Sequence, residues 1–126
     1  MPEHILVSIA WPYASAKIHV GNVTGSHLPG DIFARYHRMA GNHVLMVSGS
    51  DSHGTPITVR AEEEGKSPRE VFEAFHLTFL ELFQRLGISY DLFTHTDTEN
   101  HHRVSQDFFR ALLEAVYLYK ETQEQL

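Results

Sequence analysis

Short apolar runs alternate along this chain with longer stretches in which apolar residues recur every three or four positions. The runs 5–10 (ILVSIA) and 43–49 (HVLMVSG) are rich in branched aliphatic residues. We expect each of them to form a strand that is buried on both faces of a sheet. A weaker run, 90–95 (YDLFTH), is a candidate for a short third strand.

The clearest helix signal begins at Ser67. Ser67 can cap the helix, Pro68 suits its first position and Glu70 can reach back to complete a capping box. Apolar residues follow at spacings of three and four until Gly87, which suits the left-handed position that ends a helix.

A helix is also expected after the first strand, beginning near Gly21 or Asn22 and ending at Gly41. Pro29 and Gly30 lie inside this pattern and predict a kink or a break there.

Two further helices complete the pattern. One opens at Pro56 with Thr55 as its cap and ends near Gly65. The other follows the third strand and is capped by Thr96 or Thr98. The order strand, helix, strand, helix, helix, strand, helix predicts an α/β fold with a parallel sheet and right-handed crossovers. No linker or repeat is visible, so we expect residues 1–126 to form a single unit.

Composition narrows the class of protein. The formal charge of -6 argues against a basic surface that coats nucleic acid, although a helix N-terminus can still hold the phosphate of a nucleotide. The chain has no cysteine, which excludes disulfides and thiolate metal sites within it, and its histidines show no chelating spacing, so we expect no metal site. With neither a signal peptide nor an apolar run long enough to cross a membrane, we expect a cytoplasmic protein.

Polar residues of catalytic type follow both of the predicted buried strands. Ligands of parallel α/β sheets bind beyond the carboxyl ends of the strands. In the first loop, His19 and Asn22 can donate hydrogen bonds to phosphate at a helix start, and Gly21 permits a close approach to the backbone. In the second loop, Asp51 can bind an ammonium group or a ribose hydroxyl. Taken singly, each residue also has a purely structural explanation: His19 can be a loop histidine beside a turn glycine, and Asp51 can cap a helix or a turn.

Four segments in order resemble the methionyl-tRNA synthetases, a family of class I aminoacyl-tRNA synthetases. They are PYASAKIHVGN, DIFARYHRMAGNHV, GSDSHGTPI and LGISYDLFTHT. The resemblance implies the first half of a Rossmann-like parallel sheet of the class I synthetase (HUP) type, flanked by helices. It also implies the activity of the family: methionine and ATP, used with Mg²⁺, form methionyl-adenylate, and the methionyl group then passes to tRNA(Met).

Site residues are implied by the same resemblance. His19 and Asn22 match the positions that steady the ATP phosphates during catalysis, and Pro12 and Gly21 match further ATP-binding positions, Gly21 lying where adenine meets the backbone. For methionine, the matching positions are Trp11, Tyr13 and Asp51, with Asp51 facing the ammonium group. The family element has histidine at its fourth position, where this chain has Asn22, which donates a hydrogen bond but cannot become cationic.

Several parts of the family lie outside these 126 residues: the connective domain, which often carries zinc-binding cysteines, the second half of the nucleotide fold and the anticodon-binding domain. We therefore expect the chain alone to be inactive, and any zinc to belong to the connective domain. In the family the first strand pairs on both sides, so we also expect the chain to self-associate through an exposed sheet edge. Two other hypotheses remain: a small stand-alone nucleotidyltransferase and a non-catalytic nucleotide-binding module.

Overall fold

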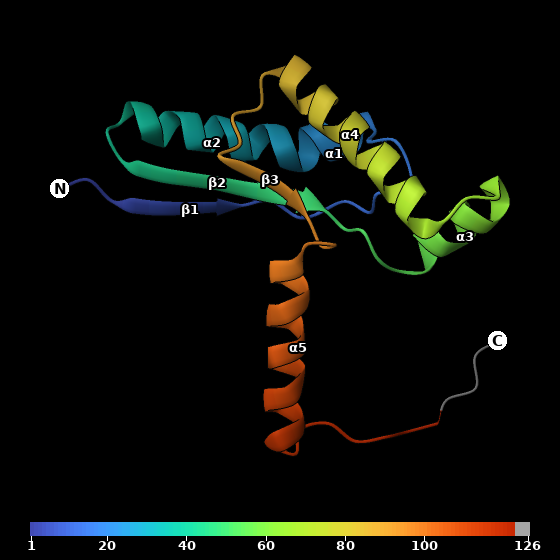
Figure 1. Cartoon of the computed structure of the whole chain (residues 1–126). Coiled ribbons are helices and arrows are strands. Elements are labelled where there is room, and N and C mark those ends of the chain that lie inside the picture. The colour runs from blue at the N-terminus through green and yellow to red at the C-terminus, as the bar shows by residue number, and fades with distance from the viewer. Residues whose placement is uncertain (123–126) are drawn as a thin grey trace. The chain divides into compact units, whose positions relative to one another are not determined.

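The computed structural model describes residues 1–122, which fall into two compact units, Met1–Thr96 and Asp97 onward. The first unit holds a three-stranded sheet and its flanking helices, and the second holds one helix (Figure 1). The element order is the one that the apolar pattern predicts.

The sheet consists of β1 (His4–Ser8), β2 (His43–Ser50) and β3 (Leu92–His95) in the order β1-β2-β3. Both pairings are parallel, with Val7 opposite Met46 and Ser50 opposite His95. The predicted parallel α/β fold is confirmed, including the weakly signalled third strand.

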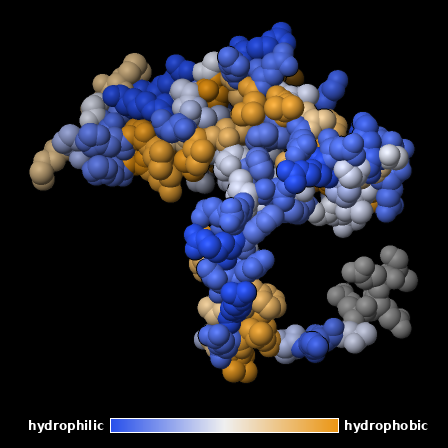
Figure 2. Space-filling model, in the orientation of Figure 1, coloured by the Kyte–Doolittle hydropathy of each residue, from blue (hydrophilic) through white to orange (hydrophobic). Residues whose placement is uncertain are grey.

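The prediction that the first two strands are buried on both faces is wrong. Val7 and Met46 are buried under a helix, but their neighbours Leu6 and Leu45 are 66% and 52% exposed. Figure 2 shows hydrophobic residues at the surface over these strands. Helices of the first unit cover one face, and nothing in that unit covers the face that carries Leu6.

One continuous helical stretch follows β1, made of α1 (Val20–Asn22), the π-helix η1 (Val23–His27) and α2 (Leu28–Met39). The predicted break at Pro29 and Gly30 does not occur, because helical residues continue through both positions. The irregularity lies just before them, where the wider π-helix leads into α2 and accommodates Pro29. Gly30 instead allows close packing, since a Cβ there would lie 2.3 Å from Cδ1 of Ile9.

The helices α3 (Thr55–Glu64) and α4 (Pro68–Leu86) pack against each other. Side chains of α4 reach β3, where the rings of Phe72 and His95 lie 5.4 Å apart. The capping box of Ser67 and Glu70 is confirmed, with the Ser67 side chain accepting from the Glu70 N–H. The predicted cap of α3 is wrong: the cap is Gly54, because its φ of 112° makes the turn into the helix, and Thr55 is the first helical residue.

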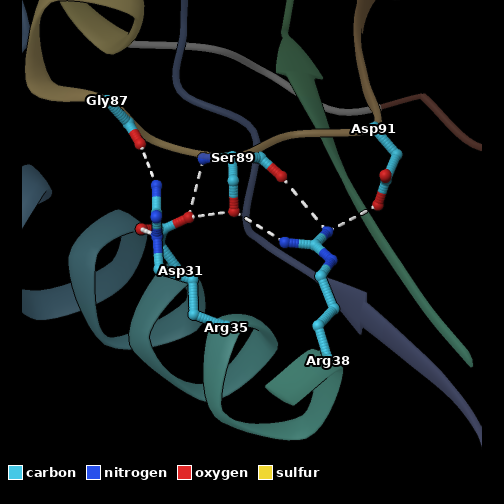
Figure 3. A network of polar contacts seen from close by, with 6 residues as sticks. All are labelled: Asp31, Arg35, Arg38, Gly87, Ser89 and Asp91. Atoms are coloured by element: carbon cyan, nitrogen blue, oxygen red, sulfur yellow. Dashed lines mark hydrogen bonds and ion pairs between the residues drawn. The ribbon is translucent and has the colours of Figure 1, made fainter. Parts of the chain in front are cut away.

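A polar network fastens α2 to the segment between α4 and β3 (Figure 3). The nearly buried carboxylate of Asp31 accepts hydrogen bonds from Ser89 N at 2.6 Å, Ser89 Oγ at 2.5 Å and Arg35 Nε at 2.6 Å. Arg38 donates to Ser89 Oγ at 2.6 Å and to Asp91 Oδ2 at 2.8 Å. These contacts set the position of the chain as it enters β3.

The second unit consists of α5 (Glu99–Glu114) and the chain that follows it. Of the two predicted caps, Thr98 is the one used, and its Oγ1 accepts from His101 N at 3.1 Å. Within residues 1–122, no helix combines the length and the apolar character that crossing a membrane requires.

Candidate functional site

The loops that leave β1 and β2 are joined directly beyond the ends of their strands. Tyr13 and Asp51 form a parallel bridge, in which Asp51 N donates to Pro12 O at 2.8 Å and Ala14 N donates to Asp51 O at 2.9 Å. The pairing of β1 with β2 thus continues into the loops, and it fixes Pro12, Tyr13 and Asp51 at the carboxyl edge of the sheet, where ligands of such folds bind.

His19 and Asn22 lock each other at the start of the helical stretch. Asn22 N donates to His19 Nδ1 at 3.3 Å, and His19 N donates to Asn22 Oδ1 at 3.2 Å. Because Nδ1 accepts a hydrogen bond, the neutral ring carries its proton on Nε2. Two donors are not used by the cap: His19 Nε2–H and the side-chain NH2 group of Asn22. Both lie beside the positive end of a helix.

Gly21 lies directly against the ring of this cap. A Cβ at Gly21 would lie 3.0 Å from both Cε1 and Nδ1 of the His19 ring. A side chain there would crowd the ring, which would have to shift by a few tenths of an ångström.

Trp11 lies against the end of β2. A Cβ at Gly49 would come within 2.6 Å of Trp11 Cζ3 and 2.6 Å of the Thr94 carbonyl oxygen, so only glycine fits between the indole and β3. Tyr13, which is 52% exposed, lies close to Gly54, whose added Cβ would be 3.3 Å from its ring. Gly49 at the end of β2 and Gly54 in the loop after it thus leave room for the two aromatic residues of the first loop.

The Asp51 carboxylate is held through one of its oxygens. Asp51 Oδ1 accepts from His53 N at 3.1 Å and from Thr96 Oγ1 at 3.2 Å. Thr96 Oγ1 in turn accepts from Ser52 N at 2.8 Å.

Two histidines, His76 and His95, lie beside Ser50 at the end of β2. Ser50 Oγ and His76 Nδ1 share a hydrogen bond of 2.7 Å, and the His76 ring meets that of His95 edge-on at 5.0 Å. Burial, together with the charge of His95, lowers the pKa of His76, which favours its neutral form. Two buried atoms here, Ser52 Oγ and His95 Nδ1, have no hydrogen-bond partner within the described part of the chain.

Comparison with known proteins identifies the family. Residues 5–126 match the family described as tRNA synthetases class I (M). The chain belongs to this family.

Relatives and solved structures agree with this assignment. The methionine–tRNA ligase of Thermomicrobium roseum is 60% identical over the whole chain, which covers 22% of that protein. The methionine–tRNA ligase of Roseiflexus sp. (strain RS-1) is 62% identical over 97% of the chain, and the match spans 21% of that protein. The chain also resembles the methionyl-tRNA synthetase of Mycobacterium tuberculosis, bound by methionyl-adenylate, with a TM-score of 0.82 and 26% identity over 91% of the chain and 22% of that protein. The chain thus spans about a fifth of the length of the curated relatives it matches.

In this class I synthetase domain, the residues expected at the site fall into two groups. Pro12, Tyr13 and Asp51 are joined by backbone hydrogen bonds. His19 and Asn22 form a separate group at the helix start, bonded to each other.

Sequence reasoning missed the residues that hold these groups in place. Gly49, Gly54 and Thr96 act through contacts between segments that are distant in the sequence. The sequence offers one signal for them: glycines lie on either side of Asp51 in SGSDSHG, and glycines in a loop can indicate close packing.

Proposed function

We propose that this chain is the N-terminal half of the catalytic nucleotide-binding fold of a methionine–tRNA ligase. That enzyme activates methionine with ATP to methionyl-adenylate and transfers the methionyl group to tRNA(Met). The observation that carries the proposal is the joining of the Pro12–Tyr13 loop to Asp51 at the carboxyl edge of the sheet, in a chain that belongs to the class I synthetases.

ATP binds on the side of the first loop. His19 and Asn22 are the catalytic residues: His19 Nε2–H and the Asn22 amide donate to the phosphates, whose Mg²⁺ ion arrives with the nucleotide. The methionine carboxylate attacks the α-phosphate in line, the bond to the bridging oxygen breaks, and pyrophosphate leaves. Donors already oriented by the cap stabilise the charge that develops in the transition state. Pro12 and Gly21 contact the nucleotide, with adenine near Gly21.

Methionine binds between the aromatic residues and the carboxylate. Trp11 and Tyr13 contact the thioether side chain, since sulfur–aromatic contacts contribute about 0.3–1.5 kcal/mol each. Asp51 accepts a hydrogen bond from the ammonium group, an interaction strengthened by the opposite charges.

The rest of the enzyme lies outside residues 1–126 under this proposal. Any zinc ion bound by cysteines would belong to the connective domain, since this chain has no cysteine to hold it. The chain alone supplies only part of the phosphate contacts, so we expect it to be inactive in isolation. The enzyme works in the cytoplasm, where its tRNA is found.

The experiment measures methionine-dependent ATP–pyrophosphate exchange on the product of the whole reading frame that encodes this chain. We expect His19→Ala to lower kcat about 10²- to 10³-fold, as removal of one transition-state donor does. Asp51→Asn should chiefly raise the KM for methionine, whereas His4→Ala, an exposed histidine at the start of β1, should change neither constant. Equal effects of His19→Ala and Asp51→Asn on both constants would refute the division of roles.

Self-association follows from the same fold. β1 has one paired neighbour in the described sheet, so its other edge is open to pairing, and the exposed Leu6 on its uncovered face makes this strand apolar. Light scattering on the isolated chain should show oligomers that Leu6→Lys reduces. Leu77→Lys on α4, which changes a residue that is 64% exposed, is the matched control and should not reduce them. A clean monomer at high concentration would contradict this part of the proposal.

A further inference from the structure

Thr96 is the first residue after β3, and it connects that strand to the loop that carries Asp51. Its N–H donates to Ser50 O at 3.2 Å, which extends the pairing of β3 with β2 by one step. Its hydroxyl group lies between Ser52 N at 2.8 Å and Asp51 Oδ1 at 3.2 Å. The first residue after β3 thus contacts three consecutive residues, from the last residue of β2 to Ser52.

The hydroxyl proton of Thr96 has a determined direction. Ser52 N–H donates to Thr96 Oγ1, so that oxygen acts as an acceptor on this side. The proton of the hydroxyl group is then free for Asp51 Oδ1, an acceptor that bears negative charge. Threonine is branched at Cβ, which restricts its side chain to few rotamers and adds to the rigidity of the arrangement.

Both hydrogen bonds to the Asp51 side chain end on the same oxygen. Oδ1 receives the Thr96 hydroxyl and His53 N–H, whereas Oδ2 has no hydrogen bond to any residue of the described chain. A carboxylate fixed through one oxygen presents the other in a set orientation. The binding group is therefore oriented before any ligand arrives, which lowers the entropic cost of binding.

We propose that Thr96 is a positioning residue for recognition of the amino-acid substrate: it fixes the Asp51 carboxylate so that Oδ2 accepts the ammonium group. This inference rests on the proposed function, in which Asp51 binds that group. Thr96 itself touches no substrate, and its effect passes entirely through Asp51 and the Ser52 backbone.

The test uses the product of the whole reading frame and separates the two KM values. Thr96→Val keeps the branched shape and removes the hydroxyl group, while Thr96→Ser keeps the hydroxyl group. We expect Thr96→Val to raise the KM for methionine about 10-fold, the size expected for a lost hydrogen bond to a charged group, and to change the KM for ATP less than about twofold. Thr96→Ser should stay close to wild type. Thr96→Ala, which adds no methyl group near the carboxylate, should reproduce the effect if Thr96→Val folds poorly.

The matched control is Thr78→Val on α4, which removes an exposed threonine hydroxyl that donates to Phe75 O at 2.7 Å. It should change neither KM. Hydrogen exchange supplies a second readout on the 126-residue chain: the Ser52 amide should lose protection in Thr96→Val and keep it in Thr96→Ser.

The outcomes distinguish this inference from the proposed function. An active wild type in which Thr96→Val and Thr96→Ala leave the KM for methionine unchanged would overturn the role of Thr96 alone. Equal rises in the KM for methionine and the KM for ATP would do the same, because they indicate a general structural role. A wild type without methionine-dependent exchange would overturn the proposed function, and the inference with it.

Discussion

Replacing Asp31 with asparagine tests the polar network that positions the chain before β3. In the wild type, Asp31 is 4% exposed and its carboxylate accepts three hydrogen bonds, two from Ser89 and one from Arg35. An asparagine at this position would keep the size of the side chain but lose the charge, and its amide group would face one of these donors. The substitution therefore removes the electrostatic part of the network with little change in volume.

The expected loss follows from the exposure of each partner. The Arg35 side chain is 51% exposed, so its ion pair contributes only about 0–1 kcal/mol. The two bonds from Ser89 are shielded and end on a charged group, where each contributes about 1.5–3 kcal/mol, and asparagine can retain one of them in weaker form. We expect Asp31→Asn to lower the free energy of unfolding by about 2–3 kcal/mol.

Urea unfolding followed by the fluorescence of Trp11 measures this change, since Trp11 is the single tryptophan and lies in the same unit. The control is Glu81→Gln, which removes an exposed carboxylate 3.8 Å from Arg85 and should change the free energy by less than about 0.5 kcal/mol. Equal effects of the two substitutions would refute the reasoning.

The pH dependence of the same variant gives a second check. Burial by itself raises the pKa of Asp31, but the hydrogen bonds from Ser89 and Arg35 outweigh it and hold the pKa below its usual 3.8. The contribution of Asp31 is therefore complete above about pH 4 and is lost as the pH falls through the folded-state pKa. The difference between wild type and Asp31→Asn should shrink accordingly in acid.

Further predictions concern packing, titration and capping. Gly49→Ala should lower the free energy of unfolding by about 3 kcal/mol or more, because the new methyl group would overlap the Thr94 backbone. Gly25→Ala, which has open space around it, should be neutral or stabilising, and thermal unfolding compares the two variants. Burial lowers the pKa of His27 and His76, so the unfolded chain binds protons at a higher pH than the folded chain does. The free energy of unfolding should therefore fall as the pH drops below about 6.5. A free energy from urea unfolding that stays constant between pH 7 and pH 5 would contradict this. Ser67→Ala should cost about 1 kcal/mol, as loss of a helix cap does, and circular dichroism during melting should detect it.

Elements governed by neighbours in the sequence could be predicted well. The capping box at Ser67 and the left-handed glycines Gly41 and Gly87 use residues a few positions apart, so the pattern alone identifies them. The parallel pairing of the strands followed from the alternation of runs.

Features that depend on distant contacts could not be predicted. Apolar residues on both sides of β1 indicated burial on both faces, but Leu6 is exposed because the helices of its unit cover only one face. Pro29 is accommodated by a π-helix rather than a break, and the pattern of apolar residues carries no signal for that choice. At the site, Asp51 could be singled out from its position after a strand, but Thr96, which follows another strand 45 residues later, could not.

The most direct test of the account is amino-acid-dependent ATP–pyrophosphate exchange by the product of the whole reading frame that encodes this chain, measured with each amino acid in turn. The account predicts exchange with methionine and background with the others. Exchange supported by a different amino acid, with none for methionine, would contradict it.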